Sequence, residues 1–501
     1  MYPHLMRRQA MRLDDLFPHL PKKEIAASGA IETTGVSVNS RKIRSGDLFV
    51  AIRGSAADGH DYIDDAIANG ASAVVAESDV GKKPVPVIIA DDTRLELARL
   101  SRAFYPGQPG MIAAITGTNG KTSTAEFLRQ IWSHIGWRSA SLGTLGVIGP
   151  VADDLAVPGL TTPDAASLHR VLDRLSRDGI SHASMETSSH GLHQKRLAEV
   201  KIAVAGFTNL SHEHLDYHAD MEDYYRAKAV LFTDLLLEGG TAVINIDSEW
   251  GQRLSQDIAD RPVHVLTVGE NPAADLRIAA IKPYEGGLAT TIRYDGLDYT
   301  LPLALTGSFQ AGNAVLAAAM AHASGLAMDH ALMSLSYIRP APGRMQTIHG
   351  HPDGAIVVVD YAHSPDAMET ALNSIRPQVR GRLGVVFGCG GDRDRAKRPE
   401  MGRIAAELAD FVIITDDNPR SEDPGTIRAE IKTACPDAIE QGDRHQAIFD
   451  GISMLGSGDI LMVAGKGHEA LQTIGSETLP FSDEATVRGI LANMANASGG
   501  A

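Results

Sequence analysis

The residues best suited to chemistry lie in the segment TGTNGKT, residues 116–122. This segment stands between an apolar run typical of a buried strand, MIAAIT, and a helical pattern, TAEFLRQIWSHIG. In such a turn, backbone N–H groups and the helix N-terminus surround a phosphate, Lys121 offsets its charge, and the Thr122 hydroxyl binds Mg²⁺. Only two residues separate Gly117 from Gly120, where the generic P-loop has four, so a glycine-rich turn with an exposed lysine is the alternative. Because strand, turn and helix follow in order, we favour a nucleotide phosphate site.

A glutamate ends a later buried-strand pattern, in the segment ETSSHG at residues 186–191. Open α/β sheets bind ligands at the carboxyl ends of their strands, and Mg²⁺ prefers oxygen ligands. Glu186 is therefore a candidate magnesium ligand. The alternative is that its carboxylate only caps the turn that follows.

Histidines and carboxylates cluster in the segment NLSHEHLDYH, where residues 212–218 hold three His and two carboxylates. The spacing is not H-E-x-x-H and no cysteine joins the cluster, so we expect no structural zinc. A solvated His-rich loop is the alternative. Lys228 follows within a helical pattern over residues 224–237, and by sequence alone it is an ordinary surface lysine.

Three polar turns in the last third of the chain each follow an apolar strand pattern. They are GCGGDRDR at 388–395, DDNPR at 416–420 and GKGHE at 465–469. Backbone N–H groups and arginines in the first turn can bind an anion, although a solvated basic turn is the alternative. Turns at the same end of one parallel sheet converge in space, so we predict that the three form one site.

The length of 501 residues exceeds what one hydrophobic core supports, and two Pro/Gly-rich joints divide the chain. The joints at 105–110 and 339–344 predict domains 1–108, 109–338 and 339–501. The first reads as a small α/β domain. The second has the uninterrupted apolar runs of a mostly parallel sheet, with a hairpin signal at Asp295-Gly296. The third alternates strand and helix, as in a doubly wound, Rossmann-like α/β domain.

The composition argues against several classes of partner. A formal net charge of −16 disfavours nucleic acid and anionic membrane surfaces. No apolar run approaches the ~20 residues of a membrane span, and the N-terminal segment lacks the pattern of a secretory signal. With only two cysteines, Cys389 and Cys435, a reducing cytoplasm is the natural compartment.

Taken in order, these motifs resemble those of the Mur ligase family, the ATP-dependent ligases of bacterial cell-wall synthesis. The resemblance covers nearly the whole chain. It is closest to the branch that adds meso-2,6-diaminopimelate to UDP-N-acetylmuramoyl-L-alanyl-D-glutamate. The motifs that carry it are SVNSR (37–41), GDLFVA (46–51), TGTNGKT, ETSSHGL, NLSHEHLDYH, Lys228, VDYAHSPDA (359–367), GCGGDRD, DNPR and GKGHE.

The resemblance implies substrate-binding and catalytic roles in the first two domains. The UDP-sugar peptide contacts Val38 and Ser40 at its uridine end and Thr161, Thr162, Ser188, Gln194 and Arg196 elsewhere. ATP contacts Gly117, Thr118, Asn119, Gly120, Lys121, Thr122, Ser123, Asn313 and Arg344. The magnesium ligands are Thr122, Glu186, His214 and Lys228, the last as a carbamate (N6-carboxylysine). Lys121, Glu186, His214 and Lys228 form the catalytic set.

The resemblance also implies the site of the incoming amino acid and the reaction. Diaminopimelate contacts Arg393, Asp417, Asn418, Pro419, Arg420, Gly465 and Glu469. The γ-phosphoryl group of ATP passes to the D-glutamate γ-carboxylate, and the amine attacks the resulting acyl phosphate. Closure about the 339–344 hinge excludes water. Arg420 suits the distal carboxylate that L-lysine lacks, and Asp417 and Asn418 suit the distal ammonium.

Other functions stay open at this stage. An L-lysine-adding relative, another Mur ligase and a ligase like folylpolyglutamate synthase share the chemistry. The DNPR and GKGHE segments and the first domain weigh against the last two. A non-catalytic nucleotide-binding scaffold is disfavoured by the intact catalytic set. We expect an ADP-forming ligase that acts in the cytoplasm as a monomer.

Overall fold

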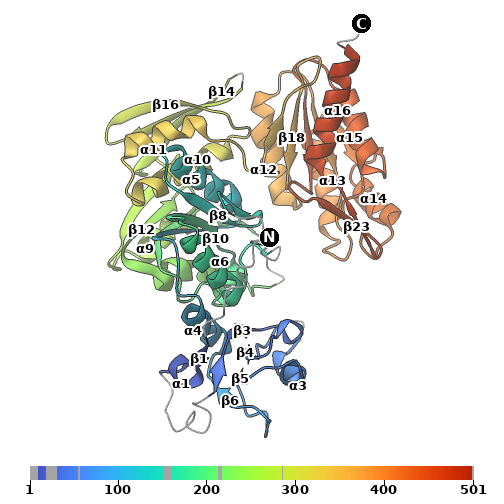
Figure 1. Cartoon of the computed structure of the whole chain (residues 1–501). Coiled ribbons are helices and arrows are strands. Elements are labelled where there is room, and N and C mark those ends of the chain that lie inside the picture. The colour runs from blue at the N-terminus through green and yellow to red at the C-terminus, as the bar shows by residue number, and fades with distance from the viewer. Residues whose placement is uncertain are drawn as a thin grey trace.

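The computed structural model describes residues 10–18, 31–54, 57–151, 155, 160–212, 217–284 and 286–498. Three α/β units follow one another along the chain, each built around its own sheet (Figure 1). This confirms the three-part α/β architecture expected from the sequence. The joints at 105–110 and 339–344 fall between the last helix of one unit and the first strand of the next. Domain limits at 1–108, 109–338 and 339–501 therefore remain our proposal.

The N-terminal domain has a four-stranded parallel sheet in the order β3-β4-β5-β6. Its strands are β3 (Gly35–Ser37), β4 (Asp47–Val50), β5 (Ala73–Ala76) and β6 (Val87–Ile89). Around it lie β1 (Met11–Arg12), α1 (Leu13–Leu16), β2 (Glu32–Thr33), η1 (Ser40–Lys42), η2 (Gly59–Tyr62), α3 (Ile63–Ala68) and α4 (Thr93–Phe104). Asp92 caps α4, because its side chain accepts hydrogen bonds from two N–H groups of the first turn. The core of this domain continues onto Ala165 and Ala198, which attaches it to the middle domain.

The middle domain has a ten-stranded sheet in the order β16-β15-β14-β13-β12-β11-β7-β10-β8-β9. Pairing is parallel from β8 to β14 and antiparallel at β9, β15 and β16. The hairpin predicted at Asp295-Gly296 is confirmed between β15 and β16, with positive φ at both residues. The strands are β7 (Met111–Thr116), β8 (Ser139–Gly143), β9 (Gly146–Ile148), β10 (His182–Glu186), β11 (Ile202–Phe207), β12 (Leu236–Asn245), β13 (His264–Gly269), β14 (Leu276–Tyr284), β15 (Gly287–Tyr294) and β16 (Leu297–Leu303).

Helices cover both faces of this sheet. Successive residues of β7 point to opposite faces, and they belong alternately to two apolar cores. One core includes α5 (Lys121–His134), α10 (Phe309–Ala323), α11 (Met328–Ser334) and η4 (Leu335–Tyr337). The other includes α6 (Ala165–Arg177), α7 (Ser189–His193), α8 (Met221–Val230) and α9 (Glu249–Asp257).

The helix predicted over residues 224–237 is wrong at its C-terminal end. Helix α8 ends at Val230, a π-helical turn (η3) spans Leu231–Leu235, and Leu236 begins β12. Leu236 pairs with Ile202 of β11, so tertiary pairing with the sheet overrides the local helical pattern.

The C-terminal domain has a six-stranded sheet in the order β17-β18-β22-β19-β20-β21. All pairs are parallel except β17 with β18, and helices pack on both faces. The strands are β17 (Gln346–Ile348), β18 (Ile356–Asp360), β19 (Leu383–Phe387), β20 (Phe411–Ile414), β21 (Ile439–Glu440) and β22 (Ile460–Ala464). The helices are α12 (Pro365–Ile375), η5 (Arg376–Gln378), α13 (Lys397–Leu408), α14 (Pro424–Lys432), α15 (Arg444–Ser453) and α16 (Asp483–Ser498). A separate hairpin joins β23 (Leu471–Ile474) and β24 (Glu477–Pro480).

None of the helices in the described ranges combines the length and the apolar character needed to cross a bilayer.

Candidate active site

The phosphate loop lies between β7 and α5, as the sequence predicted. Gly117 and Gly120 have φ of 148° and 85°, in the region that favours glycine. A Cβ atom on Gly117 would lie 1.8 Å from Thr208 Oγ1, and one on Gly120 would lie 2.3 Å from Asn313 Oδ1. Both glycines are therefore required by backbone angle and by close packing.

Hydrogen bonds from the turn after β11 hold the loop in shape. Thr118 N donates to Asn209 O (2.9 Å), and Asn119 N donates to Asn209 Oδ1 (3.0 Å). These two N–H groups are thus directed to protein, not to a phosphate. The part of the loop suited to an anion is the N-terminus of α5, where helical N–H groups lack intrahelical acceptors. Lys121 Nζ folds back and donates to Gly117 O (2.9 Å) and Thr118 O (2.6 Å).

Glu186 ends β10 beside the phosphate loop, and its side chain is buried (3% exposed). It accepts hydrogen bonds from Thr122 Oγ1 (2.9 Å), Thr144 N (2.8 Å) and Thr144 Oγ1 (3.1 Å). Ser188, not Glu186, caps the following helix α7. The carboxylate is therefore aimed at the phosphate loop.

Lys228 is buried on α8 (2% exposed), so the surface position suggested by the sequence is wrong. Its Nζ donates to Gly117 O (2.7 Å) and lies 4.5 Å from the centre of the Tyr224 ring. The contact with Gly117 places Lys228 against the phosphate loop. Residues 213–216, including His214, lie outside the described residues.

The donor atoms near the loop fit a hard divalent cation. Thr122 and Glu186 offer oxygen ligands, the type that Mg²⁺ prefers. Within the ranges that the structure describes, no three His, Cys, Asp or Glu side chains gather as a metal site. A carbamate on Lys228 would add two anionic oxygens at this point, and its remaining N–H could still donate to Gly117 O.

A cavity of about 450 Å³ lies between the middle and C-terminal domains, next to the phosphate loop. Asn119, Gly120, Ser123 and Asn313 of the middle domain line it, together with Arg344, Tyr361, His363 and Asp366 of the C-terminal domain. Asn313 Nδ2 donates to the buried Gln310 Oε1 (3.0 Å), which orients the amide. Arg344 Nη2 donates to Thr122 Oγ1 (3.3 Å), and its guanidinium lies 4.4 Å from the Tyr361 ring centre. Of the nine expected ATP contacts, five line the cavity, whereas Gly117, Thr118, Lys121 and Thr122 are not among its described lining residues.

Five residues expected to bind the UDP-sugar peptide form one hydrogen-bond network beyond the end of β10. They are Thr161, Thr162, Ser188, Gln194 and Arg196. Thr162 Oγ1 donates to Glu186 O (3.2 Å) and accepts from Ser188 N (2.9 Å). Arg196 donates to Thr162 O (2.6 Å) and to Gln194 Oε1 (2.8 Å), and burial lowers the pKa of its guanidinium. Thr161 Oγ1 is 3.1 Å from Thr144 Oγ1, which binds Glu186.

The remaining two expected contacts, Val38 and Ser40, lie in the N-terminal domain at the end of β3 and the start of η1. No hydrogen bond between described residues connects them to the network around Glu186.

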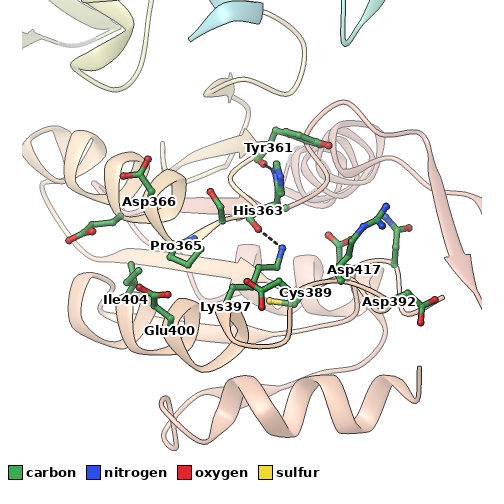
Figure 2. Close-up of a pocket in the computed structure, with 18 of the residues that line it drawn as sticks. Tyr361, His363, Pro365, Asp366, Cys389, Asp392, Lys397, Glu400, Ile404 and Asp417 are labelled. Carbon is green, nitrogen blue, oxygen red and sulfur yellow. Dashed lines mark hydrogen bonds between the residues drawn. The ribbon is translucent and has the colours of Figure 1, made fainter. Parts of the chain in front are cut away.

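The three polar turns of the C-terminal domain line a single cavity of about 1260 Å³, which confirms their predicted convergence (Figure 2). Arg393, Asp417, Asn418, Arg420, Gly465 and Glu469 all line it, whereas Pro419 is not among its described lining residues. Figure 2 shows Asp417 and Asp392 on one side of the cavity and Asp366 and Glu400 on the other. Lys397 lies between them and donates to His363 O (2.8 Å).

The arginines of this cavity have different environments. Arg420 has φ of 51°, and its Nη1 donates to Gly391 O (2.8 Å). Arg393 is exposed and makes no hydrogen bond or ion pair with any described residue. Neither is paired with a carboxylate among these residues, so both can receive one from a ligand.

Arg398 lies at the start of α13, two residues beyond Ala396, and is buried; it is not among the described residues that line the cavity. Its guanidinium is 0% exposed and bonds Glu422 (2.8 Å), Glu430 (2.6 Å) and Gly390 O (3.3 Å). Asp392 N also donates to Glu422 (2.6 Å). These contacts lower the pKa of Glu422 to about 2. The ion pair of Arg398 with Glu422 therefore connects the loop that carries Arg393 to the loop that carries Arg420.

The side chain of Asn418 already has hydrogen-bond partners in this cavity wall. Its Oδ1 already accepts from Lys466 Nζ (3.1 Å) and Thr473 N (3.0 Å). A ligand ammonium would have to displace one of these donors. Two carboxylates close to Asn418, those of Asp417 and Glu469, line the same cavity.

The phosphate loop, the cavity beside it and a second cavity that shares Tyr361, His363 and Asp366 with the first are the arrangement expected of an ATP-dependent ligase. The chain belongs to the Mur ligase family. Residues 32–108 match the model described as Mur ligase family, catalytic domain. Residues 115–321 match the Mur ligase middle domain, and residues 343–467 match the Mur ligase, glutamate ligase domain.

Curated relatives match over almost their whole length. The UDP-N-acetylmuramoyl-L-alanyl-D-glutamate--2,6-diaminopimelate ligase of Mesorhizobium japonicum is 48% identical over 483 residues, covering 96% of this chain and 99% of the relative. The ligase of the same name from Rhizobium meliloti is 45% identical, covering 97% and 100%.

Solved structures agree on the fold. One of a UDP-N-acetylmuramoyl-L-alanyl-D-glutamate--2,6-diaminopimelate ligase has a TM-score of 0.71 at 32% identity, covering 97% of this chain and 99% of that chain. MurF ligase from Thermotoga maritima in complex with ADP has a TM-score of 0.62 at 18% identity, covering 92% and 97%. At that identity the second likeness concerns the fold alone.

Proposed function

We propose that this chain is the ATP-dependent ligase that joins meso-2,6-diaminopimelate to the D-glutamate γ-carboxylate of UDP-N-acetylmuramoyl-L-alanyl-D-glutamate. The product is a precursor of peptidoglycan. The observation that carries this function is the shared wall of the two cavities. Tyr361, His363 and Asp366 line both the nucleotide cavity and the amino-acid cavity. ATP and an amino acid bound there would meet at one reaction centre.

The first step transfers the γ-phosphoryl group from ATP to the γ-carboxylate. A carboxylate oxygen forms the new bond to phosphorus, the bond to the β-phosphate oxygen breaks, and ADP leaves with that electron pair. Lys121 and the N-terminus of α5 stabilise the added negative charge. Mg²⁺, held in our proposal by Thr122, Glu186, His214 and the carbamate of Lys228, supplies further charge neutralisation when it is bound.

The second step forms the amide bond. The neutral amine of the amino acid attacks the acyl phosphate carbon, the carbon–oxygen bond to phosphate breaks, and the amine loses a proton. Because the acyl phosphate hydrolyses readily, the chemistry requires that water be kept out. The C-terminal domain lies against the phosphate loop through Asp366, which accepts from Asn119 Nδ2 (3.2 Å) and Ser211 Oγ (2.9 Å). This domain contact is suited to closing the reaction centre.

Selection of diaminopimelate over L-lysine follows from the charges that line the larger cavity. Diaminopimelate has one carboxylate more than L-lysine. We propose that Arg420, with Arg393 beside the same cavity, binds the carboxylates, and that Asp417 and Glu469 bind an ammonium. Without the distal carboxylate an arginine stays unpaired, which penalises L-lysine.

The function is tested by assaying ADP and phosphate release with each substrate omitted in turn. We expect release to need ATP, the UDP-sugar dipeptide and meso-diaminopimelate together. Faster ligation of L-lysine than of meso-diaminopimelate would instead identify an L-lysine-adding ligase. An equal rate of ATP hydrolysis with and without the two co-substrates would contradict the ligase function.

We also propose that the enzyme acts as a cytoplasmic monomer. One chain lines both cavities, and Cys389 and Cys435 are free thiols. Burial raises the pKa of Cys389 to about 12, so this thiol stays protonated beside the amino-acid cavity. Sedimentation velocity of the active enzyme tests the oligomeric state.

A further inference from the structure

A fully buried lysine lies behind the wall of the amino-acid cavity. Lys466 follows β22, and its side chain is 0% exposed. It is not among the described residues that line the cavity, yet it contacts two that do. Its Nζ donates to Asn418 Oδ1 (3.1 Å) and to Glu469 Oε2 (3.2 Å). A buried ammonium is tolerated only when it is paired and hydrogen-bonded, so these contacts hold both partners in place.

The lysine determines which way the Asn418 amide points. Asn418 Oδ1 accepts from Lys466 Nζ and also from Thr473 N (3.0 Å). Asn418 Nδ2 donates to Glu469 Oε2 (2.9 Å). A flipped amide would turn its NH₂ group toward two donors, so only one orientation satisfies the contacts.

Glu469 is held by the same two residues through one oxygen. Oε2 accepts from Lys466 and Asn418, whereas no described residue hydrogen-bonds Oε1. The Glu469 side chain is 33% exposed and lines the cavity. A carboxylate fixed through one oxygen presents the other to a ligand ammonium at a defined position.

We propose that Lys466 is a positioning residue for amino-acid recognition, acting through Asn418 and Glu469 without touching the amino acid. This inference rests on the proposed function of the cavity as the diaminopimelate site. The lysine holds the Glu469 carboxylate in one orientation, so that the substrate ammonium meets a preorganised acceptor. Its loss should impair amino-acid binding far more than ATP binding, because Lys466 contacts two residues of the amino-acid cavity and is not among the described residues that line the nucleotide cavity.

The test compares steady-state constants of the wild-type enzyme and of Lys466→Met, which keeps most of the aliphatic length of the lysine and removes its ammonium group. We expect the KM for meso-diaminopimelate to rise about 10–100-fold and the KM for ATP to change less than about 2-fold. Lys466→Gln retains a hydrogen-bond donor and should show a smaller rise, about 3–10-fold. Lys432→Met is the matched control, because Lys432 pairs with Glu440 at 3.7 Å on the surface and should leave both constants unchanged.

A double-mutant comparison separates positioning from general stabilisation. In a Glu469→Gln background, Lys466→Met should raise the KM for diaminopimelate less than about 3-fold, because the residue through which it acts has already been altered. Equal increases in the KM for ATP and for the amino acid would overturn the proposal. An unchanged KM for the amino acid in either Lys466 variant would also overturn it. The same holds if the KM increase of the double variant equals the product of the increases of Lys466→Met and Glu469→Gln. Ligation of meso-diaminopimelate by the wild-type enzyme tests the proposed function. The ratios of variant KM to wild-type KM test the role of Lys466, and they can be measured with whichever amino acid the wild-type enzyme ligates.

Discussion

At the residue scale, Gly120 illustrates how tightly the phosphate loop is packed. A Cβ there would lie 2.3 Å from Asn313 Oδ1, and φ is 85°. Gly120→Ala should therefore lose activity about 100-fold or more and destabilise the protein by about 1–3 kcal/mol. Gly136→Ala is the control, since Gly136 has φ of 86° but nothing within 4 Å of the added Cβ. Turnover and chemical unfolding of both variants check this, and normal turnover of Gly120→Ala would refute it.

Lys228 should need carbon dioxide to function. A carbamate forms from the neutral amine and CO₂, so activity should fall when bicarbonate is removed and return when it is added. Lys228→Ala should lose about 100-fold or more of its turnover, because an anionic group beside the phosphate loop is missing. Formate or acetate should restore part of that activity by entering the space. Full activity of Lys228→Arg, which forms no carbamate, would disprove the idea.

Arg420 should determine amino-acid selectivity. Arg420→Ala removes the guanidinium at the cavity wall, leaving a substrate carboxylate without its partner. The kcat/KM for meso-diaminopimelate should drop about 10–100-fold, while that for L-lysine changes much less. Lys432→Met serves again as a surface control. Parallel assays of both amino acids measure the ratio, and an unchanged ratio would exclude Arg420 from recognition.

At the element scale, the strands and the polar turns that follow them could be predicted because their signals are local. Apolar runs predicted β7, β18, β19, β20 and β22, and the parallel topology then brought three turns to one cavity. The end of α8 could not be predicted, because Leu236 pairs with a strand distant in sequence.

The burial of single charged side chains could not be predicted from the sequence either. Lys228, Arg398 and Lys466 look like surface residues in a one-dimensional pattern, and only their distant partners make burial tolerable.

The loops joined by Arg398 and Glu422 should show a measurable pH dependence. The folded pKa of Glu422 is about 2, below the usual glutamate value of about 4.3. Its ion pair therefore stabilises the fold fully above that usual value, and the contribution is lost as pH falls through the folded pKa. Glu422→Gln should lower the Tm near pH 7 and flatten the fall in Tm between about pH 4.5 and 2. Calorimetry across this range measures both slopes, and identical slopes for wild type and variant would contradict the role.

At the scale of the whole molecule, the hinge at residues 339–344 connects the two cavities. Gly343 has φ of 64°, and a Cβ there would lie 2.1 Å from His468 N and 2.3 Å from Gly467 C. The next residue, Arg344, reaches across to Thr122 in the phosphate loop. Gly343 thus packs against the 465–469 loop of the amino-acid cavity, and the next residue, Arg344, contacts the nucleotide site. Movement of the C-terminal domain about this point would change both sites together.

Gly343→Ala should uncouple that movement. Because the clashing atoms are backbone, the 465–469 loop must shift, and Glu469 shifts with it. We expect kcat to fall about 10-fold or more, the KM for meso-diaminopimelate to rise, and ligand-induced compaction in small-angle scattering to diminish. Gly354→Ala is matched, since Gly354 has φ of 77° in the same domain and nothing within 4 Å of the added Cβ. It carries a similar backbone strain without the clash, so its kinetics and compaction should stay near wild type. Equal behaviour of the two variants would show that backbone strain alone matters and that Gly343 has no part in domain closure.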